Sequence, residues 1–211
     1  RLLEFLHEHV DYRLILISAS AGYGKTTLLV DFAHDTDIPL CWYSLGPMDN
    51  DPRIFVEHFI ATIARHFPGF GERSRTILRN IERFDHQGMY SLVTALVNEM
   101  YEAIPEYFIV VLDDYHCVEG SPAINDFLSA LLEHMPENCH IIVSSRTVPG
   151  GLPLVRLTAR RQMVGLGVNE LRFTGEEIQA LIKQNYGLDM PLDKAKALAE
   201  QSEGWITGIL L

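Results

Sequence analysis

The sequence predicts an α/β fold with a parallel five-stranded sheet that helices cover on both faces. Residues 107–112 and 141–143 are continuous apolar runs, which are typical of strands buried on both sides. Helical patterns separate these runs; after Asp51-Pro52, for example, Phe55, Phe59 and Ile63 recur at intervals of four. Strands that alternate with helices indicate a parallel sheet. The 211 residues, 47% of them hydrophobic, are sufficient for a sizeable core.

Each expected element follows from such a local pattern. Gly-Pro and Pro-Gly pairs end several of the segments, and Ser121-Pro122 starts another helix. The expected strands are 14–19, 40–45, 107–112, 140–144 and a last one within 164–173. The expected helices of this part are 24–34, one from residue 52, 74–83, 88–101 and one from residue 122.

The pattern changes after residue 173. Thr174 and Glu177 form a capping-box signature, and mainly helical segments follow at 174–186, 192–202 and 205–211. We therefore expect a nucleotide-binding domain over residues 1–173 and the start of a truncated helical arm over residues 174–211. The chain ends within an apolar helical pattern, which suggests a fragment of a longer protein.

A phosphate-binding loop occupies residues 19–26, between the first strand and its helix. Its spacing matches G-x-x-x-x-G-K-[ST], except that Ala19 replaces the first glycine. Backbone N–H groups at such a helix start attract anions, and glycines let the backbone approach phosphate closely. Lys25 is expected to reach the β- and γ-phosphates, and Thr26 to ligate Mg²⁺. The expected nucleotide-binding residues here are Ala21, Gly22, Tyr23, Gly24, Lys25, Thr26 and Thr27.

Polar residues follow two further strands, at the sheet edge where ligands of parallel sheets bind. Asp113 is expected to anchor Mg²⁺, and Asp114 to orient or deprotonate the attacking water. Arg146 follows the strand at 141–143, from which it is expected to reach the γ-phosphate. Together with Lys25, these residues form the expected catalytic set. Helix-capping aspartates and a salt-bridged surface arginine are the structural alternatives.

Composition limits the other functions. The net charge of −11 argues against a large nucleic-acid-binding face, and Arg156, Arg160 and Arg161 form the only local basic cluster. No apolar run approaches bilayer length and no signal peptide is visible, so we expect a cytoplasmic protein without membrane contact. The three widely spaced cysteines are expected to be buried free thiols.

Several segments together resemble the signal-transduction ATPases with numerous domains (STAND), in the branch of MalT and the large LuxR-type transcriptional regulators. Alanine is the normal first residue of the loop in that branch, so Ala19 agrees with the family. The segments that carry the resemblance are 1–3, 18–27, 42–45, 49–52, 112–116, 144–146 and 204–205.

The resemblance implies a nucleotide-binding domain followed by a helical or winged-helix arm, with ATP/ADP and Mg²⁺ as cofactors. It adds Arg1 to the nucleotide-binding residues. In such proteins ADP holds a closed monomer, ATP with an inducer permits homo-oligomerisation, and hydrolysis resets the switch. DNA binding would belong to a domain outside these residues. Ser20 and Ile206 depart from the family, since many relatives carry proline at both positions.

Two alternatives belong to other functional classes. A P-loop kinase would transfer phosphate to a small acceptor under a basic lid, for which residues 156–161 are the candidate. A scaffold could hold nucleotide without hydrolysing it, although Lys25, Thr26, Asp113 and Asp114 argue against such degeneration.

Overall fold

The computed structural model describes residues 1–81 and 84–205, and its centre is a five-stranded sheet. The strands lie in the order β2-β3-β4-β1-β5, and every neighbouring pair is parallel. This arrangement confirms the predicted fold class. The strands are β1 (Leu14–Ser18), β2 (Leu40–Ser44), β3 (Phe108–Asp113), β4 (Cys139–Ser145) and β5 (Met163–Leu166).

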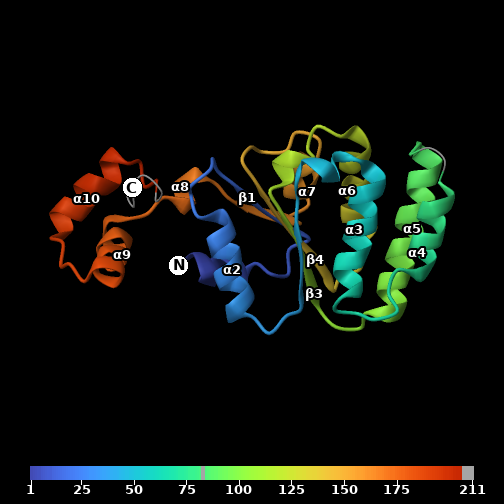
Figure 1. Cartoon of the computed structure of the whole chain (residues 1–211), viewed down its shortest axis with the longest axis horizontal. Coiled ribbons are helices and arrows are strands. Elements are labelled where there is room, and N and C mark those ends of the chain that lie inside the picture. The colour runs from blue at the N-terminus through green and yellow to red at the C-terminus, as the bar shows by residue number, and fades with distance from the viewer. Residues whose placement is uncertain (82–83, 206–211) are drawn as a thin grey trace.

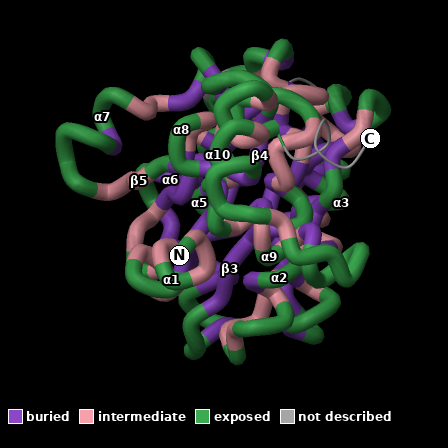
Figure 2. Tube along the Cα trace, turned by 90° about the vertical axis from the view of Figure 1, so that its left-hand side faces the viewer, coloured by how far each residue is buried: buried purple, intermediate pink, exposed green. Residues whose placement is uncertain are grey.

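Alternate residues of each strand face two separate apolar clusters, because side chains of a strand alternate between the faces of the sheet. Ile15 and Ile17 face α1 (Leu2–Glu8) and α2 (Lys25–Asp35). Leu14 and Leu16 belong to the larger cluster on the other face. That face is covered by α3 (Pro52–Ala64), α6 (Pro122–His134) and α7 (Leu154–Ala159). Helices therefore cover both faces, and β3 is buried along its whole length (Figure 2).

A helical hairpin adds a further layer outside α3 and α6. It consists of α4 (Glu72–Asn80) and α5 (His86–Ala103), and it lies at the end of the molecule farthest from the C-terminal helices (Figure 1). Short 3₁₀ turns follow β2 and β3, at Pro47–Asn50 and Tyr115–Cys117.

The C-terminal helices form a small unit of their own. After α8 (Val168–Leu171), α9 (Gly175–Tyr186) and α10 (Leu192–Gln201) pack around Ile178, Ile182 and Ala195. The capping box is present, since the amide of Glu177 donates to Thr174 Oγ1 and the amide of Thr174 donates to Glu177 Oε2. The boundary at 173/174 stays a prediction. The helix expected at 205–211 lies outside the described residues, apart from Trp205.

Several elements differ from the sequence-based expectations. The last strand ends at Leu166, because the Gly167 amide is capped by Glu170 and the chain turns into α8. The short helices α1, α7 and α8 were not expected. Of the free cysteines, Cys41 and Cys139 are buried as predicted, whereas Cys117 is only half-buried. Within the part of the chain that the structure describes, no helix has the length and apolarity to cross a membrane.

Candidate nucleotide site

The phosphate-binding loop leaves β1 and enters α2 through two glycines with left-handed backbones. Gly22 has a φ of +85° and Gly24, the N-cap of α2, has a φ of +73°. A Cβ at Gly24 would meet no atom within 4 Å, so the backbone angle rather than crowding requires glycine there. Residues 21–27 line a cleft of about 700 Å³. The loop thus supplies one wall of a cavity large enough for a nucleotide.

Lys25 is held back against the loop itself. Its Nζ donates to the carbonyl oxygens of Ala19, at 2.7 Å, and of Ser20, at 3.0 Å, and the residue is 7% exposed. Burial lowers the pKa of Lys25, opposed by the negative charges of Asp114 and Asp113 and assisted by the positive charge of Arg146. A phosphate in the cleft would offer this ammonium an anionic partner in place of the two carbonyl oxygens.

Thr26 and Asp113 meet behind the loop. Thr26 Oγ1 donates to the Asp113 carboxylate, 3.0 Å from Oδ2. Asp113 is 4% exposed and also accepts a hydrogen bond from the hydroxyl of Ser144 on β4. A hydroxyl beside a carboxylate is an oxygen ligand set that suits Mg²⁺. In the described ranges 1–81 and 84–205, no three His, Cys, Asp or Glu side chains are grouped to hold a metal alone, so nucleotide and water oxygens would complete such a site.

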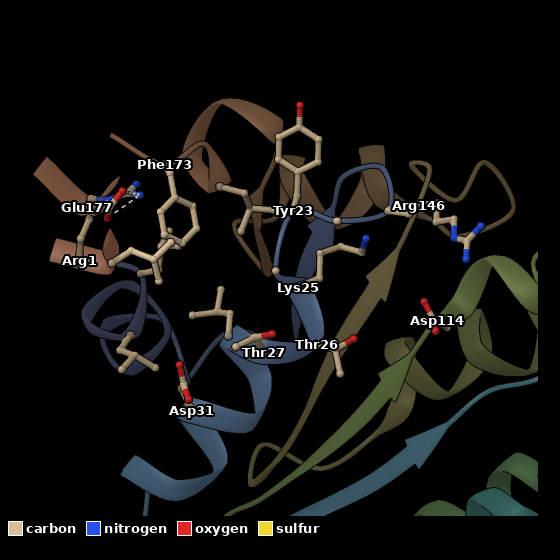
Figure 3. Close-up of a pocket in the computed structure, with 18 residues that line it drawn as sticks. Arg1, Tyr23, Lys25, Thr26, Thr27, Asp31, Asp114, Arg146, Phe173 and Glu177 are labelled. Atoms are coloured by element: carbon tan, nitrogen blue, oxygen red, sulfur yellow. Dashed lines mark hydrogen bonds and ion pairs between the residues drawn. The ribbon is translucent and has the colours of Figure 1, made fainter. Parts of the chain in front are cut away.

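Asp114 and Arg146 lie together near Lys25 and Thr26, on the side of the cleft away from Arg1 (Figure 3). Both line the cleft, and the side chain of Asp114 is 46% exposed. Asp114 has a left-handed backbone, with a φ of 62° and a ψ of 43°, which is uncommon for a residue other than glycine. The turn directs its carboxylate into the cleft, whereas Asp113 stays buried.

The opposite side of the cleft is apolar and is closed by an ion pair. Arg1 Nε donates to Glu177 Oε1 at 3.1 Å, and Arg1 also donates to the carbonyl oxygen of Glu170 at 2.6 Å. Figure 3 shows Arg1, Glu177 and Phe173 together, across the loop from Arg146. The apolar lining consists of Leu2, Leu3, Leu28, Leu171, Phe173 and Leu181. A flat aromatic base fits this chemistry.

The C-terminal part of the described chain also contacts the phosphate-binding loop directly. Trp205 Nε1 donates to the carbonyl oxygen of Ala21 at 3.0 Å. The Phe173 amide donates to the carbonyl oxygen of Gly204 at 3.2 Å, so Gly204 lies beside the residue that precedes α9 and its N-cap. The C-terminal segment therefore lines the cleft through Glu177 and Leu181, and Trp205 contacts Ala21 of the phosphate-binding loop.

The cleft brings together most of the residues predicted from the sequence. Arg1, residues 21–27, Asp114 and Arg146 line it, while Asp113 lies behind Thr26 and reaches the site through that hydroxyl. The site also includes Asp31, Glu177 and the apolar lining, with Ser144 behind Asp113, none of which was predicted from the sequence. In the sequence, an apolar residue that lines the cleft cannot be distinguished from a core residue. Glu177 already had a structural role in the capping box. The run Ser144-Ser145-Arg146 was the only available signal for Ser144.

Known proteins are similar to the chain over its whole length. No protein-family model matches the chain. The HTH-type transcriptional regulators MalT of Yersinia enterocolitica and Yersinia pestis are 34% and 33% identical to it over 214 residues, which covers 100% of the chain. The chain is therefore similar to MalT regulators along its whole length. It spans 23% of their length.

Solved structures agree on the fold. A STAND protein with a tetratricopeptide repeat sensor from Pyrococcus horikoshii superposes with a TM-score of 0.60 at 15% identity, over 99% of this chain and 28% of that one. A Walker-type ATPase of Pyrococcus abyssi gives 0.59 at 16% identity, over 99% of this chain and 64% of that one. The chain therefore shares the fold of these ATPases.

Proposed function

We propose that this chain binds ATP and ADP with Mg²⁺ and slowly hydrolyses ATP, as the switch module of a MalT-like regulator. The observation that carries the proposal is the Thr26–Asp113 hydrogen bond beside Lys25, with Asp114 and Arg146 facing the same cleft. A nucleotide-binding regulatory module agrees with the relatives.

The chain's own residues would share the chemistry as follows. Lys25 and Arg146 would stabilise negative charge on the β- and γ-phosphates. Asp114 would accept a proton from a water whose oxygen forms a new bond to the γ-phosphorus. The bond between that phosphorus and the bridging oxygen breaks, and its electrons leave with ADP. When bound next to Thr26 and Asp113, Mg²⁺ would neutralise charge on the β- and γ-oxygens.

The apolar side of the cleft would hold the base, and its contacts would carry the signal. The base would lie against Leu2, Leu3 and Phe173, near the Arg1–Glu177 pair. Because Glu177 and Trp205 belong to the C-terminal segment, nucleotide binding would change contacts of the arm. A turnover well below roughly 10 per second is expected for such a switch.

Neither alternative function has comparable support. The kinase would need a basic lid, but Arg156 is paired with Glu133 on α6 at 3.0 Å. Among the described residues that line the cleft, the only arginines are Arg1 and Arg146. The non-hydrolysing scaffold would leave Asp114 without a role at the cleft.

The decisive experiment measures hydrolysis and binding separately in Asp114→Asn. Loss of a general base slows chemistry by about 100-fold or more, so single-turnover hydrolysis should fall by that factor. Affinity for a fluorescent ATP analogue should change no more than a few-fold. Asp126→Asn, an exposed carboxylate on α6, serves as the control. Equal hydrolysis rates in wild type and Asp114→Asn would refute the assignment, and phosphate transfer to an acceptor but not to water would favour the kinase.

The rest of the regulator lies beyond this chain. We propose that ATP with an inducer promotes homo-oligomerisation, that ADP maintains the closed monomer, and that DNA contacts come from another domain of a cytoplasmic protein. Identification of the nucleotide that co-purifies with the chain tests the resting state. ADP is expected, and purification without any nucleotide would count against the switch.

A further inference from the structure

Ser144 joins the two acidic residues of the candidate site. It lies near the end of β4 and is 0% exposed. Its hydroxyl donates to Asp113 Oδ1, and its Oγ accepts a hydrogen bond from the backbone amide of Asp114 at 3.1 Å. A hydroxyl has one proton to donate, and a carboxylate only accepts. The proton therefore goes to Asp113, and an oxygen lone pair is left for Asp114.

Each of these bonds fixes something that the proposed chemistry needs. The bond to Asp113 fixes the carboxylate that also accepts from Thr26 Oγ1. The bond to the Asp114 amide holds Asp114 in its left-handed backbone conformation, with a φ of 62°. A non-glycine residue keeps such a backbone only where its surroundings hold it. This backbone turn separates the buried Asp113 carboxylate from the Asp114 carboxylate in the cleft.

We propose that Ser144 is a positioning residue for ATP hydrolysis, which orients Asp113 toward Thr26 and Mg²⁺ and holds the turn that presents Asp114 to the cleft. This inference rests on the proposed function. Ser144 itself does not line the cleft in the described part of the chain, so it acts through its two neighbours.

The next residue supplies a matched control. Ser145 is also 0% exposed and also belongs to β4, but its Oγ has no hydrogen-bond partner among the described residues. Successive side chains of a strand point to opposite faces of the sheet, so Ser145 points away from Asp113. Ser144→Ala and Ser145→Ala remove the same atom at the same depth, and only the first removes a link between the acidic residues.

The first test measures binding of a fluorescent ADP analogue in EDTA and over a range of Mg²⁺ concentrations. Ser144→Ala should leave the affinity in EDTA within about twofold of wild type. It should raise by about tenfold the Mg²⁺ concentration at which half of the Mg²⁺-dependent change in ADP affinity is reached. Such a factor is typical of residues that orient metal ligands. Ser145→Ala should change neither value by more than about twofold. Equal Mg²⁺ dependence in the two variants would overturn the proposal.

The second test measures single-turnover ATP hydrolysis at saturating Mg²⁺. The hydrolysis rate of Ser144→Ala should be at least about tenfold below that of wild type. Loss of the bond to the Asp114 amide should displace the Asp114 carboxylate, and filling the metal site does not restore its position. If Ser144→Ala fails to fold, Ser144→Cys replaces it, since a thiol has nearly the same shape but is a weak donor and acceptor. A wild-type rate in the folded Ser144 variant would refute the role toward Asp114.

The two proposals fail in different ways. If wild type does not hydrolyse ATP, or if Asp114→Asn hydrolyses it normally, the proposed hydrolysis is wrong, whereas the Mg²⁺ titration still tests the link from Ser144 to Asp113. If Asp114→Asn behaves as expected and the two serine variants are alike in both tests, the proposed function stands and Ser144 only fills space.

Discussion

Lys25 illustrates how the loop prepares a charge for phosphate. Its ammonium is nearly buried, and it donates hydrogen bonds to two loop carbonyl oxygens. Burial therefore lowers its pKa below the ordinary value of 10.5, even though Asp114 and Asp113 oppose the shift. A neutral carbonyl compensates a buried charge less well than an anion does. The residue is consequently poised to gain from a bound phosphate.

Lys25→Met should weaken ATP binding by about 10- to 100-fold, because a charge-assisted contact contributes about 1.5–3 kcal/mol. Titration with a fluorescent ATP analogue measures the loss. Lys194→Met, an exposed lysine of α10, is the control and should bind normally. A similar affinity in wild type and Lys25→Met would contradict the role of Lys25.

The same residue predicts how ATP affinity depends on pH. Lys25 attracts phosphate only while protonated, so its contribution is complete below its lowered pKa and disappears as the pH rises through that value. ATP affinity of wild type should therefore begin to fall at a lower pH than an exposed lysine would require. Affinities measured between pH 7 and pH 10 should show a smaller decline in Lys25→Met. Identical declines would assign the effect to another group.

At the scale of elements, α4 depends on a side chain from its partner helix. Its N-cap, Gly71, has no side chain to satisfy the first amides of the helix. Glu99 of α5, which is 5% exposed, accepts the amides of Arg73 and Ser74 at 2.8 Å and 3.0 Å. A carboxylate at a helix N-terminus is favourable, and here it also joins the two helices of the outer hairpin.

Glu99→Ala should lower the free energy of unfolding by about 2–3 kcal/mol, because it leaves buried helix amides without an acceptor. The control is Glu102→Ala on the same helix, which removes an ion pair with Arg73 whose side chains are 60% and 58% exposed. That pair should contribute at most about 1 kcal/mol. Urea unfolding of both variants measures the difference, and losses of equal size would show that Glu99 does not cap α4.

At the scale of the whole molecule, the cleft lies where the sheet meets the C-terminal helices. The arm lies at one end of the molecule and the α4–α5 hairpin at the other (Figure 1). Arg1–Glu177 and Trp205–Ala21 are contacts across this junction, and Ala21 belongs to the phosphate-binding loop itself. The phosphate-binding loop is therefore in direct contact with the C-terminal segment.

Trp205 should report that change. The chain has two tryptophans, so Trp42→Phe leaves Trp205 as the only indole. In a Trp42→Phe, Asp114→Asn background, which should preserve bound ATP, ATP is expected to red-shift the emission by releasing the indole from Ala21. ADP should leave the emission close to that of the unliganded chain. Identical spectra in all three states would show that the arm does not sense the nucleotide.

The fold class and the phosphate side of the candidate site could be predicted from the sequence. Apolar runs separated by helical patterns indicate a parallel sheet. The carboxyl ends of parallel strands share one edge of the sheet. The loop, Asp113, Asp114 and Arg146 could therefore be predicted to lie together. These signals are local: each depends on residues adjacent in the chain or on a rule of topology.

The apolar side of the cleft, the contacts of the C-terminal helices and the hydrogen bonds of Ser144 follow from the tertiary structure. Leu2, Phe173 and Leu181 approach one another from distant segments, and their apolar side chains give the same signal as core residues. The bond from Trp205 to Ala21 spans 184 positions of the chain. Ser144 and Ser145 are the same residue type side by side in the chain. The alternation of the strand brings only the Ser144 hydroxyl to a hydrogen-bond partner among the described residues. Packing between distant segments fixes such pairings, and the periodicity of residues along the chain does not encode them.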